Sequence, residues 1–438
     1  MNPIKVGLLG IGTVGGGTLA VLKRNQVEIA RRAGREIIVT MIADLDLDKA
    51  HSLADGNIQV TEDAFKVVTH PDIDIVVELI GGVTVAKDLI LKAIENGKHV
   101  VTANKALLAS QGTEIFAAAR ERGVIVAFEA AVAGGIPIIK ALREGLTANR
   151  IEWIAGIING TANFILSEMR EKGQSFETVL EQAKLLGYAE ADPTFDIEGI
   201  DAAHKITIMS AIAFGIPVQF DKAYVEGITQ LTGEDIRYAE DLGYRIKLLG
   251  ITKRTDSGIE LRVHPTLIPA QRLIANVEGV MNAVVVKGDA VGATLYYGAG
   301  AGAEPTGSSV VADLVDVTRM HMADPMYRVP SLAFQPDLLT NTPIIPMDEV
   351  ETAYYLRLSV VDKPGVLADV SRILANSDIS INAMVQKESA TNVNNVDIIM
   401  LTHLTREKRI NEAIDNIENL PAVTDRIIRI RLEELNDD

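Results

Sequence analysis

The sequence predicts an α/β fold built in three parts, and two patterns carry that prediction. Over residues 1–130, short apolar runs alternate with helical patterns, which is typical of a doubly wound parallel sheet. Over residues 350–438, the expected elements follow the order strand–helix–strand–strand–helix–strand, the ferredoxin-like βαββαβ plan. Residues 131–303 between them contain strand-like runs separated by helical stretches, which predicts a mixed α+β domain. The chain of 438 residues is long enough for two or three domains with sizeable cores.

Five apolar runs mark the expected strands of the first domain. They are "IKVGLLG" (4–10), "EIIVTMIADLD" (36–46), "IDIVVELIGG" (73–82), "KHVVTAN" (98–104) and "GVIVAFEA" (123–130). Helical patterns such as "AKDLILKAIENG" separate them. This alternation predicts a Rossmann-type domain with a parallel sheet.

The texture changes after residue 130, where longer strand-like runs begin. These runs are "RIEWIAGIIN" (150–159), "LGITKR" (249–254), "IELRVHPTLIP" (259–269) and "MNAVVVKGDAVGATLYYG" (281–298). Helical stretches separate them, which predicts a second sheet of mixed character. The run "PTGSSVVADLVDVTRM" then reads as a helix, and we expect the segment 305–325 to return to the first domain.

A proline-rich segment precedes the tail. Pro330, Pro336, Pro343 and Pro346 fall where the sequence has little periodicity, so we interpret residues 326–349 as a linker. The strands expected after it lie at 353–362, 379–388, 393–404 and 423–434, with helices at 363–377 and 408–420.

Composition excludes several classes of function. A net charge of −17 argues against nucleic-acid binding, because such proteins need a basic face to neutralise phosphates. No apolar stretch is long enough for a membrane span, and the N-terminus lacks the pattern of a signal peptide, so we expect a cytoplasmic protein. The sequence has no cysteine, which excludes disulfides, Cys-type zinc sites and any thiolate nucleophile.

A glycine pattern follows the first strand. Gly10, Gly12 and Gly15 have the G-x-G-x-x-G spacing, and Thr13 and Val14 would open the next helix. In this pattern, the first glycine permits a tight turn, the second lets the backbone approach a pyrophosphate, and the third allows close helix packing. The helix N-terminus then offers free N–H groups to the anion. The context of strand, turn and helix predicts dinucleotide binding.

An acid ends the second strand. Asp44 stands where a carboxylate can accept hydrogen bonds from the adenosine ribose and would repel a 2′-phosphate, which favours NAD over NADP. The alternative is a solvated acid in the turn "DLDLDK".

Two lysines occupy positions that a plain surface lysine would not favour. "IEGIDAAHKITIMSAIAFGIP" predicts an apolar, buried helix from about Gly199 to Gly215, with Asp201 and Lys205 one turn apart on one face. A buried lysine needs a partner, and the alternative is a routine surface ion pair. Lys105 lies just past the C-terminal end of a parallel strand, the edge where α/β sheets bind ligands. His204 points about 100° away from the lysine on the helix, so we interpret it as structural.

Carboxylates crowd the segment before Lys205. They are Glu190, Asp192, Asp196, Glu198 and Asp201. Such a group could hold a cationic part of a substrate, such as an α-ammonium.

The segment "AKLLGYAEADPTFDIEGIDAAHK" resembles the motif of the homoserine dehydrogenase family. Its anchors are Ala183, Gly187, Asp192, Pro193, Asp196, Gly199, Asp201 and Lys205. "GKHVVTANKALLA" and "GAGAGAEPTGSSVVADL" are also similar to family segments, and the likeness covers about residues 1–325. The tail resembles an ACT domain. The resemblance implies reduction of L-aspartate 4-semialdehyde to L-homoserine with NAD(P)H, on the route to threonine and methionine.

The resemblance also implies roles for individual residues. Lys205 would be the acid/base residue, with Lys105 between nicotinamide and substrate. Glu190 would hold the substrate's amino group, Asp196 and Asp201 would be further substrate-side acids, and Gly187 and Gly302 would line the cofactor. "EAAVAGGIP" is similar to the family's loop for a monovalent cation, Na⁺ or K⁺. Its ligands would be the Glu129 carboxyl or carbonyl and the carbonyls of Val132, Gly134 and Ile136.

Reaction chemistry agrees with this interpretation. Hydride addition to an aldehyde leaves an alkoxide, so a proton donor must reach the oxygen, and a lysine can supply it. No covalent intermediate is needed, which fits the missing cysteine.

Alternatives remain at this point. They are a non-catalytic amino-acid sensor and another NAD(P)-dependent dehydrogenase of amino or hydroxy acids. In the tail, Asp362, Lys363, Pro364 and Gly365 form a strand-to-helix turn that could take the carboxylate of L-threonine, with Asn382 as a polar partner. The tail could instead be a dimerisation domain without a ligand. We expect a homodimer or a higher homo-oligomer.

Overall fold

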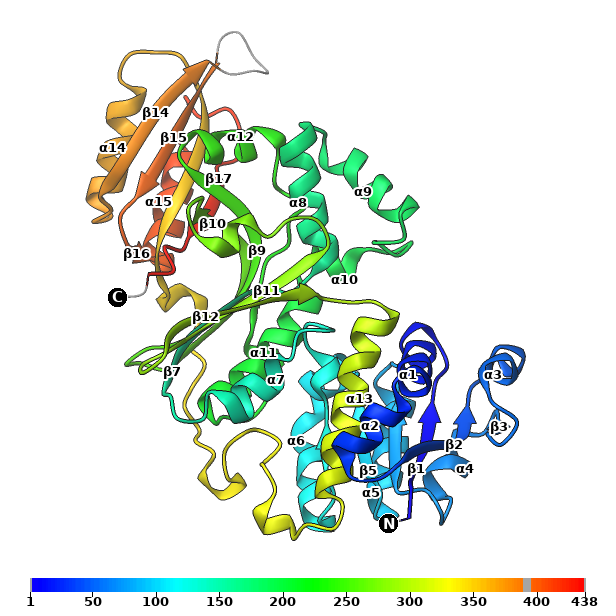
Figure 1. Cartoon of the computed structure of the whole chain (residues 1–438). Helices are drawn as coiled ribbons and strands as arrows, with labels where there is room; N and C mark the ends of the chain where they lie inside the picture. The colour runs from blue at the N-terminus through cyan, green and yellow to red at the C-terminus, as the bar shows by residue number, and fades with distance from the viewer. Residues whose placement is uncertain (1, 389–394, 437–438) are drawn as a thin grey trace. The chain divides into compact units, whose positions relative to one another are not determined.

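The computed structural model describes residues 2–388 and 395–436 (Figure 1). The chain divides into two compact units, each built from segments that are distant in sequence. The first unit comprises Met1–Ile158, Ala203–Asp221 and Met281–Thr342, and the second comprises Asn159–Ala202, Lys222–Val280 and Pro343–Asp438. Two residues of the expected strand at 393–404, at positions 393 and 394, lie outside the described residues. Along the described chain, no helix is both long and apolar enough to span a membrane.

A six-stranded parallel sheet forms the centre of the first unit, in the order β3-β2-β1-β4-β5-β6. Its strands are β1 (Ile4–Leu9), β2 (Ile37–Ala43), β3 (Gln59–Thr61), β4 (Ile75–Glu78), β5 (His99–Thr102) and β6 (Val126–Ala127). Its helices are α1 (Thr13–Arg24), α2 (Gln26–Ala33), α3 (Leu47–Leu53), α4 (Ala64–Thr69), α5 (Thr84–Glu95) and α6 (Lys105–Arg122). This confirms the predicted doubly wound domain.

Both faces of this sheet are buried, and alternate residues of a strand serve opposite faces. In β4, Ile75 and Val77 pack into one core while Val76 packs into the other. The first core also holds α13 (Ala303–Met320), which lies beside α1 (Figure 1). The two helices approach so closely that a Cβ added at Gly17 would lie 2.0 Å from the carbonyl oxygen of Ala303.

The first unit also contains an antiparallel group of three strands, in the order β12-β11-β7. They are β7 (Ile151–Ile157), β11 (Met281–Gly288) and β12 (Gly292–Ala299), with the short helix α7 (Ile138–Lys140) nearby in sequence. The run 281–298 is therefore a hairpin rather than one strand, because the chain turns at residues 289–291. The segment 325–342 belongs to this unit as well, where Arg120 donates two hydrogen bonds of 2.8 Å to Asp337.

The second unit carries the rest of the mixed sheet and the tail. Its strands follow the order β9-β10-β17-β13-β15-β14, with β8 on β10 and β16 on β13. The strands are β8 (Tyr224–Val225), β9 (Tyr244–Arg254), β10 (Ile259–Pro269), β13 (Glu351–Val361), β14 (Ile381–Glu388), β15 (Asn395–Thr402), β16 (Thr405–Arg406) and β17 (Ile428–Leu432). The helices are α8 (Gly160–Lys172), α9 (Phe176–Leu185), α10 (Thr194–Ile197), α12 (Gly233–Asp241), α14 (Val366–Asn376) and α15 (Glu407–Glu418).

The tail has the predicted βαββαβ order, from β13 through β17. Its core lies between the sheet and the two helices α14 and α15. The last strand does more than close this module, because β17 also pairs in parallel with β10, with Thr266 opposite Arg431. The tail and the strand β10 therefore share one sheet.

Helix α11 (Ile200–Phe214) has the predicted bounds and contributes to both units. It ends at Gly215, whose φ of 62° is in the left-handed region that favours glycine.

Candidate active site

The turn between β1 and α1 carries the glycine pattern. Gly10 has a φ of 92°, and a Cβ added at Gly15 would lie 2.1 Å from the carbonyl oxygen of Gly10. A Cβ added at Gly12, in contrast, would meet nothing within 4 Å. The N–H groups of Thr13 and Val14, at the start of α1, have no intrahelical acceptor, and no side chain caps this helix. These residues fit a dinucleotide pyrophosphate, which needs close backbone approach at a helix N-terminus.

Asp44 follows β2 directly and is tied to the glycine turn. Its carboxylate accepts the N–H of Ile11 at 2.5 Å and the N–H of Asp46 at 2.8 Å. A carboxylate has about four lone-pair sites, so it can still accept a hydroxyl. Asp44 is thus more than a solvated acid of the turn, because it links the end of β2 to the first residues after β1.

Lys105 is the first residue of α6 and is half-buried, just past the C-terminal end of β5. Asn104 caps this helix by accepting the N–H of Leu107 at 3.1 Å, and its side-chain nitrogen donates to the carbonyl oxygen of Gly82 at 2.6 Å. The cap therefore holds the start of α6 against the loop after β4. The predicted placement of Lys105 at the ligand-binding edge of the sheet matches the observed strand order.

Glu78, at the end of β4, is a buried acid that the sequence analysis did not single out. It is fully buried, accepts the hydroxyl of Thr102 at 2.7 Å, and accepts the N–H groups of Ile80 and Gly81 at 3.0 and 3.1 Å. Burial raises the pKa of Glu78, against the opposing effect of these hydrogen bonds. Glu78 therefore joins the loop after β4 to Thr102 at the end of β5, close in sequence to Lys105. The available signal was an acid closing an otherwise apolar strand in "VVELIGG".

Lys205 lies in the buried part of α11, with 8% of its surface exposed. Its ammonium donates to the carbonyl oxygen of Ile158 at 2.7 Å. His204 packs against the ring of Phe220, with ring centroids 4.3 Å apart, as a structural residue would. Both side chains lie in the interior, as the apolar character of the helix predicts, and a charged lysine there requires polar partners.

Two of the five crowded acids meet at one residue. The side-chain nitrogen of Asn159 donates to Asp196 at 2.7 Å and to Asp201 at 2.9 Å. Asp201 is buried and Asp196 is half-buried. The sequence analysis did not identify Asn159, although an asparagine before the helical run "GTANFIL" is a typical N-cap signal.

The other three acids do not join this cluster in the same way. Asp192 accepts the hydroxyl and the N–H of Thr194 at the start of α10, at 2.6 and 3.1 Å. Glu198 accepts the hydroxyl of Thr229 at 3.2 Å. Glu190 is exposed on the loop after α9. Asn159 thus joins two of the five acids, Asp196 and Asp201, while Asp192 and Glu198 have hydrogen-bond partners of their own.

The two outlying glycines both have backbone angles that glycine favours. Gly187 follows α9 with a φ of 75°, and Gly302 caps α13 with a φ of 130°. Both are exposed. Gly187 belongs to the second unit and Gly302 to the first.

The loop 129–136 presents backbone oxygens. Its residues Ala133 and Gly134 both have positive φ, and the carbonyl oxygen of Gly134 accepts the hydroxyl of Ser309 at 2.6 Å. The carboxylate of Glu129 accepts the N–H groups of Ile139 and Lys140 at 2.9 and 2.8 Å, so it caps α7. The carboxylate of Glu129 is thus engaged in this cap, and its carbonyl oxygen accepts the N–H of Val132 at 3.3 Å.

The chemistry of this loop suits a hard cation. Carbonyl oxygens are the donors that such cations prefer. In the described residues, no cluster of three or more histidine or carboxylate side chains could hold a metal. Burial, and next the nearby Asp313, raise the pKa of Glu129 to about 7. A cation at the adjacent carbonyls would add positive charge beside a buried acid.

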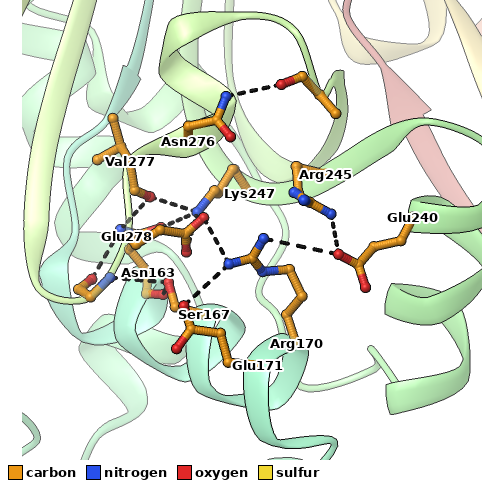
Figure 2. A network of polar contacts seen from close by, with 12 residues as sticks. Asn163, Ser167, Arg170, Glu171, Glu240, Arg245, Lys247, Asn276, Val277 and Glu278 are labelled. Carbon is orange, nitrogen blue, oxygen red and sulfur yellow. Dashed lines mark hydrogen bonds and ion pairs between the residues drawn. The ribbon is translucent and has the colours of Figure 1, made fainter.

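Helix α8, which Asn159 caps, is held by a buried polar network (Figure 2). The ammonium of Lys247 on β9 donates to the side-chain oxygen of Asn163 at 3.1 Å and to the carbonyl oxygen of Val277 at 2.6 Å. The side-chain nitrogen of Asn163 also donates to Val277, at 3.1 Å, and Arg170 pairs with Glu278 at 3.2 Å. Burial lowers the pKa of Lys247 to about 8. The network fixes α8 to the strand and the loop beside it.

A cavity of about 320 Å³ opens at the turn between β13 and α14. It is lined by the residues of the turn, Asp362–Val366, and by Gln386, Val396 and Ile398 from neighbouring strands. Gly365 caps α14 without a side-chain hydrogen bond. Asn382 lies on β14, as expected, and is exposed.

Three comparisons with known proteins agree on the family. The homoserine dehydrogenase family matches residues 137–315, and its NAD-binding domain matches residues 10–129. The ACT domain matches residues 354–422.

Relatives match over the whole chain. A homoserine dehydrogenase of Pseudomonas aeruginosa is 64% identical, with 100% of both chains covered, and one of Neisseria gonorrhoeae is 59% identical with the same coverage. The crystal structure of a homoserine dehydrogenase from Thiobacillus denitrificans is 70% identical, covers 100% of this chain and 99% of its own, and gives a TM-score of 0.95. A hyperthermophilic archaeal homoserine dehydrogenase in complex with NADPH is 26% identical with a TM-score of 0.62 and covers 72% of this chain and 98% of its own.

Proposed function

The chain belongs to the homoserine dehydrogenase family, and from that premise we propose how its residues carry out the reaction. The enzyme is an NAD(P)-dependent oxidoreductase that interconverts L-aspartate 4-semialdehyde and L-homoserine. The observation that carries the proposal is Lys205, a buried lysine one helical turn after Asp201. A sensor that only binds amino acids would need no such acid/base group.

Lys205 is the proton donor and acceptor. A nicotinamide cofactor held at the glycine turn would supply the hydride to the aldehyde carbon. The carbonyl oxygen, which keeps the electron pair of the broken π bond, then takes a proton from the Lys205 ammonium. In the reverse direction, the neutral amine of Lys205 takes the hydroxyl proton of homoserine. The hydrogen bond to Ile158 holds the lysine in place, at 2.7 Å.

The substrate's ammonium is held by carboxylates. Asp196 and Asp201, which share Asn159, offer a pair of negative charges, and the exposed Glu190 on the loop after α9 would add a third. Charge-assisted hydrogen bonds of this kind are about twice as strong as neutral ones.

The cofactor is held at the glycine turn. Gly10, Gly12 and Gly15 would admit the pyrophosphate to the N–H groups of Thr13 and Val14, and Lys105 would lie between nicotinamide and substrate. Asp44 would accept the ribose hydroxyls, which favours NAD, and Gly187 and Gly302 would also contact the cofactor. The open space above Gly12 supports this arrangement.

The loop 129–136 binds a monovalent cation, Na⁺ or K⁺, through four backbone carbonyls. These belong to Glu129, Val132, Gly134 and Ile136. The support is the all-oxygen donor set and the two residues with positive φ at the centre of the loop. Thermal denaturation in the presence of sodium, potassium or choline chloride tests this: both metal ions should raise the melting temperature above that in choline.

The tail regulates the enzyme by binding L-threonine in the cavity between β13 and α14. The free N–H groups of α14 would take its carboxylate, and Asp362 would take its ammonium. Replacing Asp362 with alanine should abolish inhibition by threonine but spare activity, whereas the same change at the exposed Asp425 should leave both inhibition and activity unchanged. Truncation near Asp348 is a blunter test, because it also removes the strand that pairs with β10.

The enzyme assembles as a homodimer or a higher homo-oligomer. The support is β12, which ends the strand order of its group and exposes Leu295 and Tyr297. Light scattering after size-exclusion chromatography would measure the mass, and Tyr297→Arg should lower it.

The assay for the main activity is direct. The purified chain, given L-homoserine with NAD⁺ or NADP⁺, should produce the reduced nicotinamide. If no reduction occurs with either cofactor, the proposed reaction is wrong.

A further inference from the structure

The side-chain amide of Asn159 joins Asp196 and Asp201, two acids of the candidate active site. Asn159 is 4% exposed, and its side-chain nitrogen has two N–H protons. One goes to Asp196 at 2.7 Å and the other to Asp201 at 2.9 Å. Both donors of this nitrogen are therefore committed to carboxylates.

The orientation of this amide follows from the helix that it caps. Its oxygen accepts the N–H of Ala162 at 2.8 Å, which is the N-cap bond of α8. An N–H group can only be met by the oxygen, so the nitrogen must face the two acids. The cap thus prevents the amide from turning its oxygen toward the carboxylates, where it would repel them.

The position of the amide is equally constrained. The next residue, Gly160, has no room for a side chain, because a Cβ there would lie 2.8 Å from the carbonyl oxygen of Val280. One turn along the same helix, Asn163 is bound to Lys247 (Figure 2). Asn159 therefore stands on a helix that is fixed at both its first residue and its first turn.

The residue before Asn159 serves the proton donor. Ile158 accepts a hydrogen bond from Lys205 through its backbone carbonyl, at 2.7 Å. Two consecutive residues thus hold the acid/base lysine and the two acids. A small displacement here would alter both parts of the site together.

Two carboxylates close to one neutral group repel each other, and one of them then tends to retain a proton. Hydrogen bonds donated to both favour the ionised state of both. Other titratable groups on the surrounding elements are Glu190, Asp192 and Glu198 on the same segment, Lys184 on α9, His204 and Lys205 on α11, and Glu226 after β8, which pairs with Arg431. The amide of Asn159 donates directly to both acids, so its two protons favour their ionised state.

We propose that Asn159 is a positioning residue that keeps Asp196 and Asp201 ionised and aimed at the substrate's ammonium. This inference rests on the proposed function of the site. It adds a residue that touches no substrate and acts through the two acids.

The test is Asn159→Asp. Aspartate is as good an N-cap as asparagine, so α8 keeps its cap. The amide that donates to both acids is, however, replaced by a third carboxylate. We expect KM for homoserine to rise about tenfold or more, with a smaller change in kcat, because hydrogen bonds to charged groups are among the strongest. A new ionisation should also appear in the pH profile of kcat/KM, with activity falling as pH rises and the added carboxyl loses its proton.

A second variant and a control complete the design. Asn159→Ser keeps a capping oxygen, but its side chain is too short to reach the acids. This variant should therefore raise KM without the new ionisation. It also tests the proposal if Asn159→Asp does not fold. In the control Asn276→Asp, the replaced amide donates to two backbone carbonyls at 2.9 Å, and neither KM nor the profile should change.

The outcomes distinguish a failure of the positioning role of Asn159 from a failure of the proposed function. A wild-type chain that oxidises homoserine, together with Asn159 variants whose KM and pH profile match it, overturns the positioning role. Variants that lose only thermal stability also overturn it, because capping alone then explains the residue. A wild-type chain without activity overturns the proposed function instead.

Discussion

Arg431 on β17 donates a hydrogen bond of 2.8 Å to the carboxylate of Glu226. Glu226 directly precedes Gly227, where a Cβ would lie 2.5 Å from the carbonyl oxygen of Ile197. Ile197 in turn follows Asp196, one of the two acids that Asn159 holds. One ion pair and one close backbone contact therefore connect the tail to the substrate side of the site.

This connection predicts that Glu226→Gln weakens regulation more than catalysis. Burial would raise the pKa of Glu226, but Arg431 and its other donors outweigh it and hold the pKa below the ordinary value. The variant removes the charge and keeps the shape, so kcat without threonine should stay near wild type. The maximal inhibition by threonine should fall severalfold, since allosteric coupling is typically about 1–3 kcal/mol. Inhibition curves measure this, with the exposed Glu412→Gln on α15 as the control. Unchanged curves would place the coupling elsewhere.

Replacing Lys205 with methionine should lower kcat by two or more decades. The change keeps most of the apolar stem but removes the proton, and general acid–base catalysis contributes about 10²–10⁴. Cofactor affinity, measured by fluorescence titration, should stay near wild type. In the wild-type enzyme, homoserine oxidation should accelerate toward alkaline pH, because it needs the neutral amine. Lys222→Met, at an exposed lysine beyond the same helix, is the control, and a Lys205→Met enzyme with near-normal kcat would remove Lys205 from the mechanism.

Asp44→Asn should lower kcat/KM for NAD relative to that for NADP. The amide oxygen can still accept the N–H of Ile11, so the glycine turn is kept while the negative charge is lost. Initial rates at several concentrations of each cofactor give the two values of kcat/KM, and their ratio should shift toward NADP by about tenfold, since a hydrogen bond to a charged group is worth about 1.5–3 kcal/mol. Asp46→Asn, two residues away at the cap of α3, should leave the ratio unchanged. Equal losses for both cofactors would mean that Asp44 only supports the turn.

The lowered pKa of Lys247 predicts that the free energy of unfolding rises at alkaline pH. Burial lowers its pKa from 10.5 to about 8, so between these values the unfolded chain binds more protons than the folded chain. The free energy of unfolding should therefore increase with pH across this window, by at most on the order of 3 kcal/mol. Denaturant titrations of wild type and Lys247→Met across the window would isolate this contribution, because the variant lacks it. Parallel pH dependences for the two proteins would contradict the prediction.

Much of the fold could be predicted from local pattern. The alternation of apolar runs and helices identified the parallel sheet, and the glycine after β1 marked the turn that the positive φ of Gly10 requires. The end of α11 followed from Gly215, because glycine readily adopts the left-handed conformation that ends a helix, and Gly199 directly precedes the first residue of the helix. These features depend on interactions between residues that are close in the sequence, so the local pattern is enough to predict them.

The remaining features depend on contacts between distant segments. Asn159 reaches acids that are 37 and 42 positions away, and nothing near it in the sequence identifies those partners. The same holds for Lys247, whose buried ammonium is satisfied by α8 and the loop at Val277. The hairpin at 281–298 was predicted as one run because its turn residues, Asp289, Ala290 and Val291, lack a two-residue signal such as Asn-Gly or Asp-Gly.

The pairing of β17 with β10 has a consequence for synthesis. A ribosome delivers β10 long before β17, so the nascent chain holds an open strand edge until the tail follows. During that interval, the buried Arg262 of β10 has Glu260 but lacks Glu433, which later accepts its hydrogen bond at 2.6 Å. The sheet is therefore completed only after most of the polypeptide has been translated, and the nascent enzyme passes through a stage in which chaperones could recognise that edge.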